Sequence, residues 1–140
     1  MNSTVRGILA VVVGFVLACV VMLIVEGING HVIYPGLGEQ AKGVTDPEKI
    51  RAIMAAAPTG AFVVVLFGWI LGSLVGGLTA TWLGKRPPYG LAIVIGVLIT
   101  LGAIANNMML PPPAWFWVLG LIAPIPAACF GARFATKAAA

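Results

Sequence analysis

The sequence predicts an all-α, polytopic membrane protein: a bundle of four transmembrane helices with a short interfacial helix in the first external loop. Composition is the first indication, because 61% of the residues are hydrophobic and 9% are charged, whereas about a quarter are charged in soluble domains. The mean hydropathy of +1.08 agrees. The apolar stretches are also continuous rather than alternating, which excludes a transmembrane barrel. At 140 residues, the chain is predicted to be a single membrane domain, 1–140.

The four spans follow from the uncharged stretches. The first stretch runs from Arg6 to Glu26; it is longer than the core of a signal peptide and predicts a retained helix at 5–28. The stretch after Arg51 predicts a helix at 60–83. The next stretch is too long for one helix, and the prolines at 111–113 divide it into spans 89–109 and 114–135, because proline removes backbone donors.

A different pattern marks the segment before the second span. Thr45 and Glu48 have the spacing of a capping box, and Pro47 lies where the first turn begins. The charges of this segment precede its apolar residues. We therefore expect an interfacial helix at 46–57, joined to the second span by a kink at Pro58.

Lysine and arginine predict the orientation, since they are enriched in cytoplasmic loops. The end with more of them carries Arg6, Lys85, Arg86, Arg133 and Lys137, and the opposite end carries Lys42, Lys49 and Arg51. Both termini are thus expected to be cytoplasmic, with loops 30–59 and 110–113 external. The net charge of +4 is small and dispersed, so no nucleic-acid partner is predicted.

Small residues recur every four positions in three spans. They are Gly68, Gly72, Gly76 and Ala80 in the second span, Ala123, Ala127, Gly131 and Ala135 in the fourth, and Ala10, Gly14 and Ala18 in the first. Such rows let helix backbones approach closely in lipid. They predict packing within one chain or, alternatively, a contact with a neighbouring subunit. Pro124 and Pro126 interrupt the fourth span. They predict either a structural kink or a broken helix that lines a binding site.

The candidate polar site is centred on Glu26, which lies near the end of the first span. A carboxylate is costly there, because the helix dipole disfavours an anion at a C-terminus and the membrane disfavours charge. Asn29-Gly30 is expected to end this helix. His31, Tyr34, Asn106 and Asn107 are predicted to lie at the same level, and we expect Asn106, Asn107 or His31 to donate a hydrogen bond to Glu26. The cluster is interpreted either as a binding site or as a structural latch.

Trp115 and Trp117 begin the fourth span on this side and are predicted to be interface anchors. No metal site or cofactor is predicted, because glutamate, histidine and asparagine make a poor zinc set. No serine or cysteine is evidently paired with a base. Enzymatic activity is accordingly not predicted.

The chain resembles an uncharacterised group of small bacterial four-span inner-membrane proteins. The resemblance rests on Glu26, the Tyr34-Pro35 loop, the small-residue second span and GAIANNMMLPPPAWF at 102–116. It implies a multi-pass protein of the bacterial inner (cytoplasmic) membrane and no particular activity. The small multidrug-resistance transporters have a similar size and a membrane glutamate, but Glu26 lies at the end of its span and the first external loop is long.

Two functions are open from the sequence. The first is a non-enzymatic bundle that acts through helix packing, as a homo-oligomer or as an accessory subunit with other membrane protein subunits as partners. The alternative is a small transporter or channel with its polar site near Glu26, His31 and Asn106. If Glu26 faced lipid or open water without a polar partner, the second function would be excluded. Burial of the second-span row within one chain would remove the main argument for assembly.

Overall fold

The computed structural model describes residues 1–85 and 89–139, and these residues form helices and connecting segments without a β-strand. The elements in chain order are α1 (Ser3–Ile28), η1 (Asn29–Ile33), α2 (Pro35–Ala41), α3 (Pro47–Ala56), α4 (Thr59–Gly84), α5 (Gly90–Met109), α6 (Ala114–Ile122) and α7 (Pro124–Ala139).

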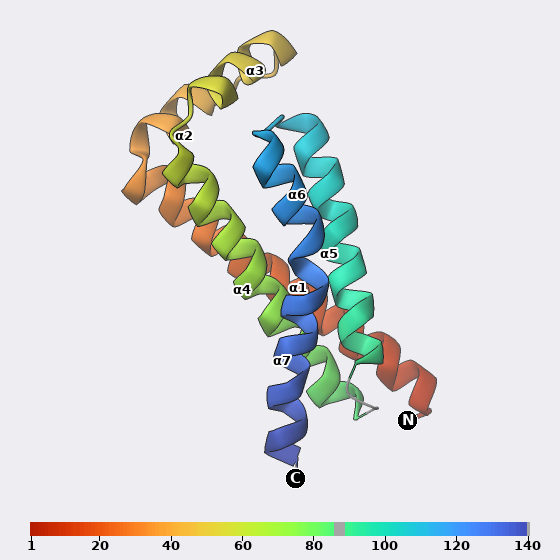
Figure 1. The fold of residues 1–140 in the computed structure, drawn as a ribbon. Coiled ribbons are helices and arrows are strands. Elements are labelled where there is room, and N and C mark those ends of the chain that lie inside the picture. The colour runs from red at the N-terminus through yellow and green to blue at the C-terminus, as the bar shows by residue number, and fades with distance from the viewer. Residues whose placement is uncertain (86–88, 140) are drawn as a thin grey trace.

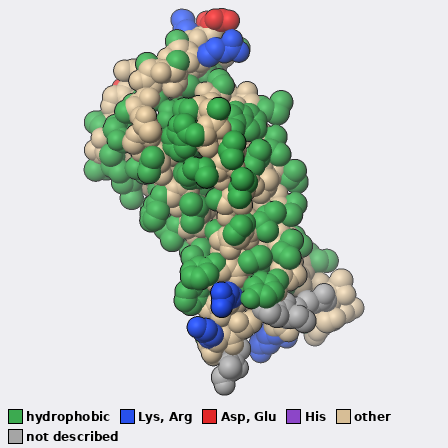
Figure 2. Space-filling model, viewed as in Figure 1, with side chains coloured by type: hydrophobic (Ala, Val, Ile, Leu, Met, Phe, Trp, Pro, Cys, Tyr) green, Lys and Arg blue, Asp and Glu red, His purple; other side chains and the backbone are tan. Residues whose placement is uncertain are grey.

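Four helical segments of the described chain are long and apolar enough to cross a membrane: Ser3–Ile33, Thr59–Gly84, Gly90–Met109 and Ala114–Ala138. Each overlaps one of the predicted spans. Apolar side chains cover the middle of the visible face, and charged side chains gather at its two ends (Figure 2). The protein is therefore all-helical, with four candidate membrane-spanning helices.

The chain runs up and down, so that both termini lie at the same end (Figure 1). Arg6, near the start of α1, donates from Nε to the carbonyl of Leu83 at the end of α4, at 2.9 Å. This bond ties the two antiparallel helices together and satisfies one of the carbonyls that a helix C-terminus leaves without an intrahelical partner. Arg86, which contributed to the predicted orientation, lies outside the described residues.

The α-helix α1 ends at Ile28 with Asn29 as its C-cap, as predicted, but the helical chain does not stop there. Asn29 keeps right-handed helical angles (φ −57°, ψ −52°), and the chain continues as the short π-helix η1 until Tyr34, whose N–H bonds to the carbonyl of Asn29 at 2.7 Å. The Asn29 side chain donates to the carbonyl of Ala61 at 3.0 Å, so it binds α4. Glu26 consequently lies about 10 Å inside the helix that ends at Ile33, at ~1.5 Å per residue.

The segment between the first two spans holds two short helices, α2 and α3, where the sequence predicted one. α3 occupies nearly the predicted range, but its N-cap is Asp46 rather than Thr45: Asp46 Oδ1 accepts from the Glu48 N–H at 3.1 Å. Because proline has no N–H to satisfy, Pro47 suits the first helical position after this cap. Pro58 separates α3 from α4 and is the N-cap of α4.

The small-residue row of α4 packs against α1. Gly68, Gly72, Gly76 and Ala80 are all buried. A Cβ on Gly72 would lie 2.8 Å from the carbonyl oxygen of Ala18, and one on Gly14 would lie 2.7 Å from that of Gly76. The two backbones therefore touch where both helices lack large side chains, as expected for small-residue contacts in membranes.

The opposite face of α4 packs against α7. A Cβ on Gly77 would collide with the backbone of Ala128, and one on Gly131 with the backbone of Leu74. The buried positions of the last span include Ala128, Gly131, Ala132 and Ala135, whereas Ala123 and Ala127 are only half-buried. A strict spacing of four rotates by about 40° per step around a 3.6-residue helix, so the predicted row turns away from α4 at one end.

The last span is divided into α6 and α7 at Ala123, immediately before Pro124. Pro124 is buried, and its missing N–H is compatible with the first position of the new helix. This break lies beside Gly96 of α5, where a Cβ would lie 2.6 Å from the Cα of Ile125. The predicted proline interruption thus coincides with a close approach of α5 and α7.

Candidate functional site

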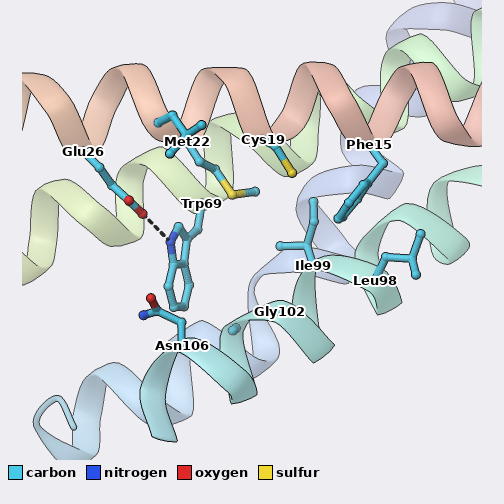
Figure 3. Close-up of a pocket in the computed structure, with 11 residues that line it drawn as sticks. Phe15, Cys19, Met22, Glu26, Trp69, Leu98, Ile99, Gly102 and Asn106 are labelled. Carbon is cyan, nitrogen blue, oxygen red and sulfur yellow. Dashed lines mark hydrogen bonds between the residues drawn. The ribbon is translucent and has the colours of Figure 1, made fainter. Parts of the chain in front are cut away.

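The α1–α4 pair and the α5–α6 hairpin diverge toward the end that carries α2 and α3 (Figure 1). A cavity of about 330 Å³, here named the apolar cavity, lies between α1 and α5, with Trp69 of α4 on its wall. Figure 3 shows Glu26 and Asn106 projecting into it from α1 and α5, with the Trp69 indole between them. The lining residues are Phe15, Cys19, Met22, Leu23, Glu26, Trp69, Leu98, Ile99, Gly102, Ala103 and Asn106.

Glu26 accepts its hydrogen bond from a residue that was not predicted to belong to the site. Trp69 Nε1 donates to Glu26 Oε1 at 3.3 Å (Figure 3), instead of the predicted Asn106, Asn107 or His31. Trp69 is 4% exposed, and its ring packs against Phe116 at a centroid distance of 5.0 Å and an interplanar angle of 63°. A Cβ on Gly120 would lie 2.9 Å from Trp69 Cζ3, so this glycine leaves room for the indole.

A second cavity of about 290 Å³ lies on the other side of Glu26, toward α2 and α3. We name it the amide cavity because Asn29, Asn106 and Asn107 all line it; Leu37 of α2 and Met54 of α3 contribute to its apolar wall. Glu26 and Asn106 line both cavities. They therefore lie where the two spaces adjoin.

Asn107 is the most unusual polar residue of the site. It is 1% exposed, yet neither its Oδ1 nor its Nδ2 has a hydrogen-bond partner among the described residues. The Oδ1 of Asn29 is likewise buried and unpartnered, although its Nδ2 binds Ala61. Buried polar groups are nearly always satisfied in proteins, and these amides line a cavity.

His31 and Tyr34 do not join Glu26. Neither is among the described residues that line the two cavities. His31 is exposed on η1 and lies beside Gly38 of α2. Tyr34 is half-buried, and its hydroxyl lies against Gly60 at the start of α4. Both side chains therefore lie where η1 meets α2 and α4.

Trp115 and Trp117 are half-buried at the start of α6. Trp115 packs edge-to-face against Phe62 and Phe116, at centroid distances of 6.5 and 5.9 Å. It thereby extends the aromatic cluster that supports Trp69. Trp115 therefore packs against aromatic residues of the protein itself. Its predicted role as an interface anchor remains a prediction.

The sequence contained an indication that Trp69 belongs to the site. Tryptophans of membrane helices concentrate at the two interfaces, whereas Trp69 lies about 15 Å from the start of α4 at ~1.5 Å per residue. A tryptophan at that depth has an N–H that requires an acceptor. Glu26 is the acidic residue of the neighbouring helix, so the pair was deducible once α1 and α4 were known to be adjacent.

The nucleophilic side chains nearest to Glu26 are Cys19 and Ser73. Cys19, the thiol on the cavity wall, is two turns from Glu26, about 10 Å along α1 at ~1.5 Å per residue, too far for direct proton transfer. Ser73, one turn from Trp69, donates its hydroxyl to the Trp69 carbonyl at 2.7 Å. The described residues contain no group of three His, Cys, Asp or Glu side chains that could hold a metal ion.

The fold defines a class: a small helical protein with four candidate membrane spans, between which the candidate polar site lies. Comparison with protein-family models, curated protein sequences and solved structures finds no match.

Proposed function

We propose that the protein is a small membrane transporter that binds its substrate beside Glu26. The observation that carries this proposal is the position of Glu26 and Asn106, which line both the apolar cavity and the amide cavity. Ionisable residues within membrane segments usually face the bundle interior or a cavity, and they mark substrate and ion pathways. Glu26 also has a polar partner in Trp69, as a site residue requires.

The position of the cavities supports a route for the substrate. Leu23, on the wall of the apolar cavity, is 67% exposed on the surface that would face lipid. The amide cavity lies under α2 and α3, toward the end of the bundle. A substrate that passes between the cavities must pass Glu26 and Asn106. Transport would then connect the bilayer with the aqueous side that carries α2 and α3.

Assembly through the α4 small-residue row has lost its main support. Gly68, Gly72 and Gly76 are buried in the chain's own packing, so this row is not free for a neighbouring subunit. An oligomer or an accessory subunit would have to use another surface. Binding of a substrate in the cavities would explain why the polar residues Glu26, Asn106 and Asn107 lie on their walls. Assembly with other subunits gives these residues no role.

We also propose the topology expected from the sequence, with both termini on the cytoplasmic side of the bacterial inner membrane and α2 and α3 outside. In a reporter-fusion experiment, alkaline phosphatase joined after Lys137 should be inactive, because that enzyme requires export. The same reporter inserted at Gly43, between α2 and α3, should be active. The reverse pattern would invert the proposed direction of the route.

Transport itself is testable in proteoliposomes with a panel of labelled organic cations, anions and neutral solutes. We expect uptake of at least one solute class by the wild-type protein and at least tenfold slower uptake by Glu26→Gln, since a charged hydrogen bond is worth ~1.5–3 kcal/mol. The matched control is Glu48→Gln, because Glu48 is exposed on α3 and away from both cavities. Uptake that is equal in the wild type and Glu26→Gln contradicts the proposal.

A further inference from the structure

The charge on the cavity walls is one-sided. Among the described residues that line the apolar and amide cavities, Glu26 is the one charged side chain; none is lysine, arginine or histidine. Arg6, a basic residue of the same helix, is engaged with Leu83 near the opposite end of the bundle. The site therefore offers a negative charge and hydrogen-bond acceptors. No positively charged side chain among the described residues on the walls of the two cavities balances the charge of Glu26.

Glu26 is incompletely satisfied by the protein. Its hydrogen bond comes from the neutral indole N–H of Trp69 and reaches Oε1. Transfer of a carboxylate into apolar surroundings is costly unless the charge is paired and hydrogen-bonded. A ligand that carries a positive charge and N–H donors would provide both compensations.

Two of the three buried side-chain atoms without a partner among the described residues are acceptors that call for donors, and the third, Asn107 Nδ2, is a donor. Asn29 Oδ1 and Asn107 Oδ1 are buried acceptors without a partner among the described residues, and both residues line the amide cavity. Asn106 brings a third amide to the boundary with the apolar cavity. A protonated amine has several N–H groups to share among these oxygens, whereas a quaternary ammonium has none.

The apolar cavity suits a hydrocarbon body. Beyond Glu26 and Asn106 its wall is formed by side chains such as Phe15, Leu98 and Ile99 (Figure 3). A volume of about 330 Å³ is at the lower end of the range of small-molecule sites. The ring of Trp69, whose N–H bonds to Glu26, would also favour a cation near its face.

We infer that this site takes a protonated organic amine with an apolar body, its ammonium group beside Glu26 and Asn106 and its body in the apolar cavity. This inference rests on the proposed function and names its substrate class. The amine group has two sources, a free amphiphilic amine from solution or the ethanolamine headgroup of a lipid, and the experiment separates them.

The test uses Trp69 as its own reporter. Of the four tryptophans, Trp82, Trp115 and Trp117 are replaced by phenylalanine, and the protein is placed in nanodiscs of phosphatidylcholine. Hexylamine should change the Trp69 emission saturably. Hexyltrimethylammonium, 1-hexanol and hexanoate should each bind about tenfold more weakly or worse, because they lack the N–H donors, the charge or the correct sign.

Two variants and a second membrane complete the design. Glu26→Gln should abolish the saturable response, and Glu48→Gln should retain it. Asn106→Ala is a second site variant, and we expect it to weaken hexylamine binding without loss of the folded protein. In nanodiscs that contain phosphatidylethanolamine, a changed Trp69 emission and weakened hexylamine binding identify the lipid amine as the ligand, whereas unchanged behaviour identifies a free amine.

Equal binding of 1-hexanol and hexylamine, or a hexylamine response that survives in Glu26→Gln, overturns the amine assignment. So does the absence of any Trp69 response in both membranes. Failure of the amine assignment can be distinguished from failure of the proposed function. Glu26-dependent uptake of an anion or a neutral solute would support transport and contradict only the amine as its substrate. Glu26-independent behaviour in both assays removes both proposals.

Discussion

Gly77→Ala is expected to destabilise the protein by ~1–3 kcal/mol, the usual cost of an inserted methyl group in a packed interior. The added Cβ would meet the Cα, the carbonyl carbon and the carbonyl oxygen of Ala128. These are backbone atoms, so no side chain can rotate away and α4 must separate from α7. Thermal unfolding in mild detergent, followed by circular dichroism, should show a lowered midpoint.

Gly102→Ala is the matched control. Gly102 is also within a membrane helix, but no heavy atom lies within 4 Å of its added Cβ. Because alanine favours the helix over glycine by about 1 kcal/mol, this variant should keep or raise the midpoint. If the same glycine-to-alanine change lowers the midpoint at Gly77 and keeps or raises it at Gly102, the contact between α4 and α7 is the cause of the destabilisation. Equal shifts in the two variants would contradict the α4–α7 contact.

The four helical spans were predictable because they depend on composition along the chain alone. Uncharged stretches of sufficient length, and the prolines at 111–113, set their bounds within a few residues. The end of α1 at Ile28 was also predictable, from the local preference of Asn29 and Gly30 for a stop. The continuation of the chain as η1 was not predictable in this way, since Asn29 there bonds to Ala61, which is distant in sequence.

The composition of the candidate site was predictable only in part. Glu26, Asn106 and Asn107 were predicted to be polar groups at a common level of the bundle, and all three line the amide cavity. Their partners depend on which helix faces which. The row Gly68, Gly72, Gly76 brings α4 against α1, and this packing puts Trp69, rather than an asparagine, within reach of Glu26.

Asn107→Leu is expected to stabilise the folded protein while it weakens ligand binding. The Asn107 amide is buried without a partner among the described residues, and each unsatisfied buried group costs ~1–3 kcal/mol. Leucine has a similar volume and no polar atoms. The thermal midpoint in detergent should therefore rise, whereas the hexylamine response of Trp69 should fall. Such opposed effects are typical of residues kept for function at a cost in stability.

Asn29→Leu is the corresponding control. It makes the same substitution at a position where the side-chain Nδ2 has a hydrogen-bond partner and only Oδ1 has none among the described residues. The lost bond from Asn29 Nδ2 to the Ala61 carbonyl leaves a buried backbone acceptor without this donor and removes one contact between η1 and α4. Its thermal midpoint should fall. If Asn107→Leu also lowers the midpoint, the Asn107 amide contributes to the fold and its place in a ligand site loses its support. A rise with unchanged hexylamine binding would leave Asn107 outside the site and restrict recognition to Glu26 and Asn106.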